Sequence, residues 1–219
     1  MGKKLSLCLL LLAIALLALP PVFCHSQQEA VRKIDFSAFS AASLVLSFVL
    51  LSLSPSKRTA SLSAKQRFAS FILSIKAATF CLASLMLIFA FFQAVQAVLP
   101  QGVAAGQQSV QMPSGALGWA SLVLALASGA LFEEALYRQF LPETLIALLP
   151  QKRLLAIAGE LLCVALFALA HKGGPLALLN AASCGAALRF FRRKSPTVIP
   201  VFAAHFVYNL TLTLFALLL

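Results

Sequence analysis

Apolar runs long enough to cross a lipid bilayer dominate this sequence and leave few alternatives for its fold. They are separated by short segments that contain glycine, proline and basic residues. A membrane-spanning helix needs roughly 20 apolar residues, because inside the bilayer its backbone can hydrogen-bond only to itself. The sequence therefore predicts an all-α, polytopic transmembrane bundle of about six to seven spans. The expected spans are residues 5–24, 36–53, 76–99, 116–140, 154–170, 175–191 and 198–219.

Composition supports the same conclusion. Hydrophobic residues make up 61% of the 219 residues and charged residues 11%. Soluble domains are about 45–50% apolar and about 25% charged, so an ordinary globular or disordered protein is excluded. We expect an integral membrane protein and place it in the plasma, or inner, membrane.

The excess of basic residues fits a membrane better than a nucleic acid. Lysine and arginine total 17 against 6 acidic residues, giving a net charge of +11. Most of the basic residues lie in short loops between apolar runs, where they set orientation and contact anionic headgroups. We therefore expect membrane lipids as partners and no nucleic acid. The 5 cysteines are scattered without C-x-x-C spacing, which argues against a disulfide framework.

We divide the chain into three parts. Residues 1–24 are either a signal peptide or the first transmembrane helix, and the sequence leaves both open. A lipoprotein anchor at Cys24 is a weaker alternative, because the bulky Phe23 precedes that cysteine. Residues 25–113 are predicted to be accessory helices and loops, and residues 114–219 the functional core.

Ionisable side chains inside the apolar runs indicate where function lies. Glu133 and Glu134 are adjacent in one run, while His171 and His205 lie in or beside two others. A charged group within a membrane span costs several kcal/mol unless it is paired or solvated. These residues are therefore the default functional candidates.

Helical spacing groups these residues with further polar partners. Residues four apart share a helix face, which pairs Glu134 with Arg138 and His205 with Asn209. Phe167 and His171 have the same spacing. Separate helices can thus present a carboxylate, two imidazoles and a carboxamide to one interior, a set sufficient for amide hydrolysis.

We assign roles from that chemistry. Glu133 acts as general base toward a water that His171 holds, and later gives the proton to the leaving amine. His205 and Asn209 stabilise the negative oxygen that forms when water attacks a peptide carbonyl. The alternatives are a structural Glu134–Arg138 salt bridge, an interfacial His171 and a packing pair of His205 with Asn209.

Other polar residues are expected to have structural roles. Glu160 is interpreted as interfacial and Glu143 as part of a loop or bent helix after Pro142. Tyr137 and Asn180 are interpreted as packing residues or interface anchors.

Three short motifs give the sequence a family resemblance. Residues 133–138 match EExxxR, residues 167–171 match FxxxH and residues 205–209 match HxxxN. In this order within a multispan protein, they resemble the CPBP intramembrane proteases, which include CAAX prenyl proteases and bacteriocin-processing or self-immunity proteins. The resemblance covers approximately residues 114–219.

The resemblance implies a glutamate-dependent intramembrane peptidase. By position, it implies that Glu133 and His171 activate water, that His205 and Asn209 form the oxyanion site, and that Glu134 and Arg138 support Glu133. No cofactor is expected. Zinc held by Glu133, His171 and His205 is the lesser possibility, and the sequence has no H-E-x-x-H motif.

The predicted spans place Glu133 and His171 at opposite membrane depths. To bring them together, we hypothesise that Glu133 starts a separate helix or lies deeper than hydropathy suggests. We further expect the helix bearing His171 to continue past Gly173.

Three functions follow as alternatives. The first is an endopeptidase acting on membrane-embedded or lipidated peptides and proteins, CAAX-type sequences or peptide precursors among them. The second is a catalytically silent immunity or scaffold protein. The third is a small proton-coupled transporter, since intramembrane acids also serve proton relays.

Overall fold

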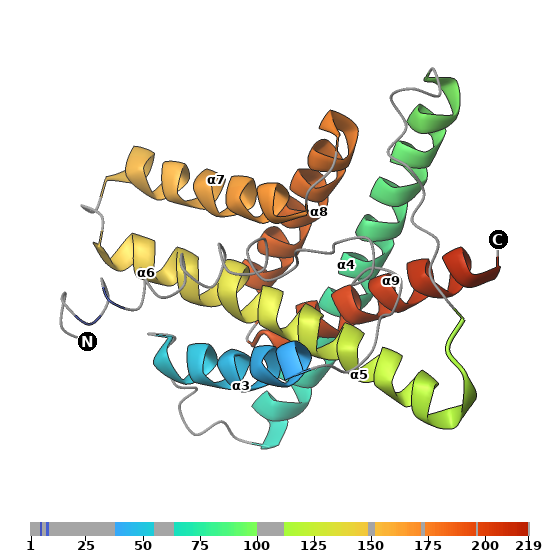
Figure 1. Ribbon diagram of the computed structural model, residues 1–219. Helices are drawn as coiled ribbons and strands as arrows, with labels where there is room; N and C mark the ends of the chain where they lie inside the picture. The colour runs from blue at the N-terminus through green and yellow to red at the C-terminus, as the bar shows by residue number, and fades with distance from the viewer. Residues whose placement is uncertain are drawn as a thin grey trace.

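The computed structural model of this protein describes residues 38–54, 64–99, 112–148, 152–171, 174–195 and 197–218, with the isolated Leu5 and Cys8. These ranges are helical throughout apart from short turns, and they contain no strand (Figure 1). The predicted all-α fold is confirmed there. The alternatives for residues 1–24, including a lipid anchor at Cys24, lie outside the described residues apart from those two positions.

The helices follow one another along the chain, with one long rod at the centre. Its parts α5 (Gly115–Glu133), η1 (Glu134–Phe140) and α6 (Leu141–Leu148) join without a break, and η1 has π-helical hydrogen bonding. The other helices are α3 (Ala38–Leu53), α4 (Ala64–Val98), α7 (Arg153–Ala170), α8 (Pro175–Lys194) and α9 (Ile199–Leu218).

Within the described ranges, 4 helices are long and apolar enough to cross a membrane: Ser70–Val98, Gly115–Leu148, Arg153–Ala170 and Ile199–Leu218. The expected spans at 36–53 and 175–191 contain α3 and α8. However, the apolar part of α3 is only Ser40–Leu53, and α8 ends in a cluster of basic residues. Large apolar side chains such as Phe80, Phe91 and Leu161 are exposed, as lipid-facing residues of an integral membrane protein are.

Two helix boundaries differ from those predicted. The span expected to open at Lys76 belongs to a helix that already starts at Ala64. The span expected to end at Phe140 continues to Leu148, through Pro142. Hydropathy detects apolar composition, whereas these helices also continue through polar segments.

The change to π-helical bonding just before Pro142 explains how the rod continues. In an α-helix the Arg138 carbonyl would accept a hydrogen bond from residue 142, but proline has no N–H. The segment before the proline is π-helical, and there the N–H of Leu141 bonds to the carbonyl of Leu136, five residues earlier. Such π-bulges insert an extra residue into a helix and frequently occur at functional sites.

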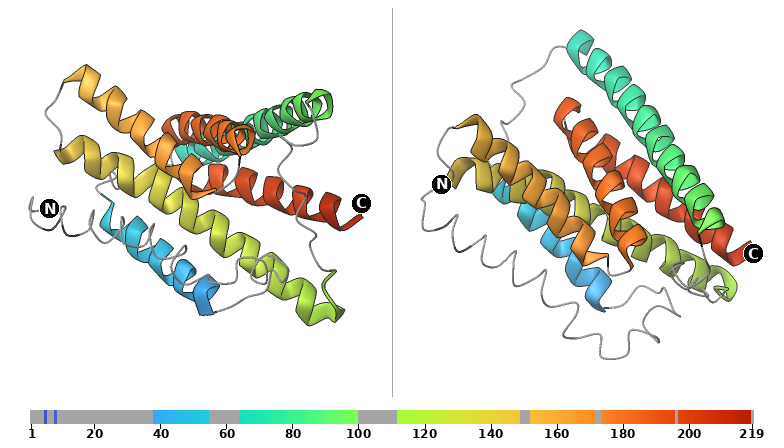
Figure 2. Two further views of the ribbon diagram at one scale, coloured as in Figure 1. Left: turned by 45° about the horizontal axis from the view of Figure 1, so that its top comes forward. Right: turned by 90° about the horizontal axis from the view of Figure 1, so that it is seen from above.

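The rod lies between two groups of helices. In Figure 2, α3 runs alongside the rod, α7 packs on α6 and α8, and α4 packs on α8 and α9. One apolar cluster joins α3, the rod and α7 through residues such as Leu50, Phe140 and Phe167. A second joins α4, α8 and α9 through residues such as Leu85 and Leu188.

Gly185 permits the close approach of α7 and α8. A Cβ atom at this position would lie 2.8 Å from Cδ1 of the buried Phe167 ring. We therefore expect Gly185→Ala to destabilise the protein by about 1–3 kcal/mol, as overpacked cores do. Thermal unfolding in detergent measures this effect.

Gly129→Ala is the matched control for this substitution, because a Cβ there meets no atom within 4 Å. Alanine is favoured over glycine in a helix by roughly 0.5–1 kcal/mol, so this variant should be at least as stable as wild type. Equal unfolding midpoints for the two variants would contradict the close-packing argument.

Candidate active site

A buried ion pair lies within η1. The Glu134 side chain is fully buried, and its Oε1 lies 3.6 Å from Nε of Arg138, one helical turn later. The Arg138 guanidinium carbon lies 3.7 Å above the centroid of the Phe167 ring on α7. Phe167 also makes an edge contact with Tyr137, so an aromatic pair packs against the arginine side chain.

His205 on α9 connects the two glutamates. Its Nδ1 lies 2.8 Å from Oε1 of Glu134. Its Nε2 lies 3.7 Å from Oε2 of Glu133. Because an ionised carboxylate only accepts hydrogen bonds, Nδ1 carries a proton and donates a hydrogen bond to Glu134. Glu134 therefore orients the ring so that Nε2 faces Glu133.

His171 has an equally defined orientation at the end of α7. Its Nδ1 lies 2.8 Å from the carbonyl oxygen of Phe167, which can only accept, so Nδ1 is the protonated nitrogen. The rings of Phe167 and His171 are tilted, with centroids 4.3 Å apart. When the imidazole is neutral, its Nε2 keeps a lone pair for another hydrogen bond.

The helix bearing His171 does not continue past Gly173 as expected. It ends at Ala170, and His171 is the C-cap with φ −82° and ψ 0°. The histidine N–H bonds to the Ala168 carbonyl and its ring bonds to the Phe167 carbonyl, which closes the last turn. Pro175 then begins α8.

Of the two alternatives proposed for Glu133, the separate helix is wrong. Glu133 does not start a separate helix, because it ends α5 within a continuous rod. Its greater depth in the membrane stays a prediction, although the apolar rod that carries it does extend to Leu148. The structure describes a contact of Glu133 with His205 that the sequence did not predict, and the action of Glu133 and His171 on one water stays a prediction.

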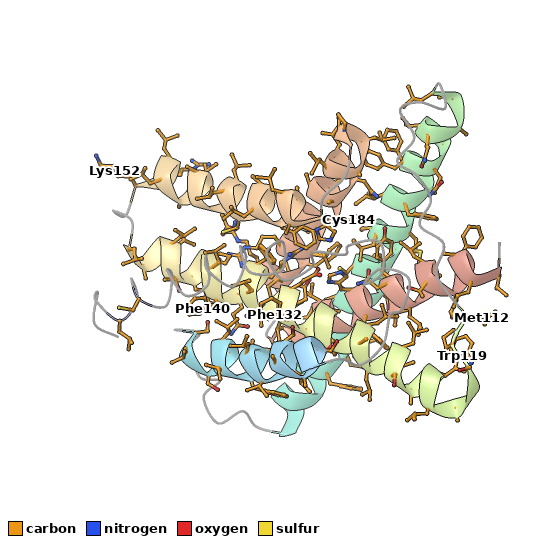
Figure 3. All side chains as sticks on the ribbon, viewed as in Figure 1. Met112, Trp119, Phe132, Phe140, Lys152 and Cys184 are labelled. Carbon is orange, nitrogen blue, oxygen red and sulfur yellow. The ribbon has the colours of Figure 1, made fainter. Side chains whose placement is uncertain are left out.

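A cavity of about 260 Å³ lies between α4, α7, α8 and α9, and His171, His205 and Asn209 line it. Glu133 is not among the lining residues and adjoins the cavity through its contact with His205. Cys184 also lines the cavity, and Figure 3 shows this residue in the middle of the molecule, far from both Trp119 and Lys152. Apolar side chains, including Leu85, Leu188 and Leu212, complete much of the wall.

Sequence reasoning missed three polar residues of this cavity. Asn180, interpreted as packing, lines the cavity together with Cys184 and Tyr208. The Cys184 sulfur lies 3.7 Å from the Asn180 Oδ1 and 3.9 Å from the Tyr208 hydroxyl. The four-residue spacing of Asn180 and Cys184, and the position of Tyr208 beside Asn209, were the available signals.

Glu160 and Glu143 make contacts that the sequence did not predict. Glu160, interpreted as interfacial, forms a bidentate ion pair with Arg189, whose Nε and Nη2 each lie 2.6 Å from a carboxylate oxygen. Glu143 lies on α6, accepts a hydrogen bond from Ser54 and lies 4.0 Å from Arg192. Both residues therefore belong to polar contacts between helices.

The zinc alternative requires Glu133, His171 and His205 to converge on one ion. Across the described ranges, no three histidine, cysteine or acidic side chains are grouped so as to hold a metal ion. The contacts of Glu133, Glu134 and His205 are instead carboxylate–imidazole pairs.

Comparison with known proteins finds a family model that matches part of the chain. The family model described as type II CAAX prenyl endopeptidase Rce1-like matches residues 115–211. The matched segment begins with the rod, ends within α9 and includes every candidate site residue. Comparisons with curated proteins and with solved structures give no match.

Proposed function

We propose that this membrane protein hydrolyses a peptide bond in prenylated CAAX-type substrates, because residues 115–211 match the family model of the Rce1-like type II CAAX prenyl endopeptidases. The observation that carries the proposal is the cavity that His171, His205 and Asn209 line, with Glu133 beside His205. In this proposal Glu133 supplies the base, and the lining residues supply two imidazoles and a carboxamide.

Exposure distinguishes the two glutamates. Glu134 is 0% exposed and is held by Arg138 and His205, whereas the Glu133 side chain is 29% exposed. Glu133 is therefore the glutamate able to meet a water molecule and take its proton. Glu134 instead positions His205. Arg138, which packs on the Phe167 ring, in turn holds Glu134.

Hydrolysis begins with the activation of water. Glu133 removes a proton from a water molecule that donates its other hydrogen bond to Nε2 of His171. The water oxygen then attacks the carbonyl carbon of the substrate. Glu133 later passes the proton to the amide nitrogen as the carbon–nitrogen bond breaks, so the products are a carboxylate and an amine.

The developing oxyanion faces His205 and Asn209. Asn209 can donate from its amide, and His205 can donate from Nε2 in its doubly protonated form. In a site sheltered from bulk water, such donors lower the barrier by several kcal/mol. The apolar wall of the cavity is compatible with a lipidated, membrane-anchored substrate. We propose membrane lipids as its surroundings and the plasma membrane as its location.

The purified protein in lipid vesicles tests the proposal with a fluorescent farnesylated CAAX peptide and the same peptide without the lipid. We expect cleavage of the farnesylated peptide and much slower cleavage of the other. Asn209→Ala should lower kcat by about 10²- to 10³-fold, as loss of an oxyanion donor does.

Asn180→Ala is the matched control for Asn209→Ala, since it removes the same carboxamide from another wall of the cavity. We expect a far smaller change in kcat for this variant. Equal losses in the two variants would contradict the oxyanion role. Absence of cleavage together with proton-driven uptake of a solute would favour a transporter.

A further inference from the structure

We propose that Arg189, held by Glu160, is a positioning residue that fixes η1 and thereby aligns Glu133 and Glu134 with His205. The proposal rests on the proposed function, because its effect is measured on peptide cleavage. It concerns an ion pair between α7 and α8 that lies outside the EExxxR, FxxxH and HxxxN motifs.

The first step concerns the backbone of η1. The Arg138 carbonyl cannot receive its normal α-helical hydrogen bond, because residue 142 is a proline. Pro142 is fully buried, and Arg138 belongs to a segment whose residues are all buried. A buried carbonyl left without a donor costs about 1–3 kcal/mol, so a donor from outside the rod stabilises this position.

Arg189 supplies that donor from α8. Its Nη1 donates a hydrogen bond to the Arg138 carbonyl. Its Nε and Nη2 are both occupied by the Glu160 carboxylate at 2.6 Å. The carboxylate therefore fixes the plane of the guanidinium and leaves the third nitrogen directed at η1.

The hydrogen bond from Arg189 to η1 is linked to the candidate catalytic residues. The residue whose carbonyl is held, Arg138, is also the residue whose side chain pairs with Glu134. Glu134 in turn accepts the hydrogen bond from His205, whose other nitrogen faces Glu133. A shift of η1 would displace these groups together, and a displacement of about 1 Å can cost 10²-fold in rate.

Arg189→Lys separates positioning from charge. Lysine retains the positive charge next to Glu160, but a single ammonium cannot form the bidentate pair and reach the Arg138 carbonyl in the same planar arrangement. We expect kcat on the farnesylated peptide to fall about 10- to 100-fold, with KM changed less than threefold. Glu160→Gln should lower kcat in the same direction, because it loosens the guanidinium.

Arg193→Lys is the matched control, since Arg193 lies on the same helix and is exposed. We expect its kcat to equal that of wild type. Thermal unfolding in detergent is measured for each variant, and kcat is determined at least 15 °C below the lowest midpoint. A kcat loss in the folded Arg189→Lys protein then reflects alignment and not unfolding.

The outcomes separate the two proposals. Wild-type cleavage together with a wild-type kcat for Arg189→Lys would overturn the positioning role and leave the proposed function intact. A rise in KM without loss of kcat would also overturn it, because η1 would then affect binding and not alignment. Failure of wild type to cleave any peptide would overturn the proposed function and the positioning role with it.

Discussion

Glu133→Gln is expected to abolish peptide cleavage while the protein remains folded in the membrane. Glutamine has almost the same size as glutamate but cannot accept the proton of the attacking water. General-base catalysis contributes roughly 10²- to 10⁴-fold, so kcat should fall by about 10³-fold or more. Release of the fluorescent peptide under saturating substrate measures this loss.

Glu143→Gln is the control for this prediction. It makes the same chemical change on the same rod, but Glu143 contacts Ser54 and Arg192 and does not line the cavity. We expect nearly wild-type cleavage. Full activity in Glu133→Gln would contradict the base assignment. Activity that a chelator removes and zinc restores would assign the water activation to a metal.

Arg138→Leu is expected to have the largest effect on stability. Arg138 and Glu134 are both almost fully buried, and removal of the arginine leaves a carboxylate in an apolar interior. Breaking a buried ion pair from one side costs about 3–5 kcal/mol. The same substitution also removes the cation that rests on the Phe167 ring.

The double variant Arg138→Leu with Glu134→Gln tests the cause of this loss. It removes both charges, so we expect it to recover a substantial part of the stability lost in Arg138→Leu. Thermal unfolding in detergent compares wild type, the two single variants and the double variant. A double variant less stable than Arg138→Leu would show that the uncompensated charge is not the reason.

Local periodicity predicts the contacts that lie within one helix. The four-residue spacing of Glu134 and Arg138 predicts their contact, because neighbouring turns of a helix bring such side chains together. The apolar runs likewise predict the helices that carry His171 and His205. These predictions depend only on the geometry of a single helix.

The spacing of residues within one helix does not predict contacts between different helices. The pairing of Glu160 with Arg189 and the pairing of Glu133 with His205 depend on how separate helices cross. The rod also continues beyond Pro142, because a change in hydrogen bonding accommodates the proline. For this reason hydropathy alone placed Glu133 near the end of a span.

The central claim is that Glu133 and His171 act on one water molecule beside the cavity. A double-mutant cycle of Glu133→Gln and His171→Ala tests it most directly, with kcat measured on the farnesylated peptide. If both side chains serve the same water, the double variant should be about as slow as the slower single variant, because groups that act as a unit are not additive. Losses that multiply in the double variant would contradict the claim.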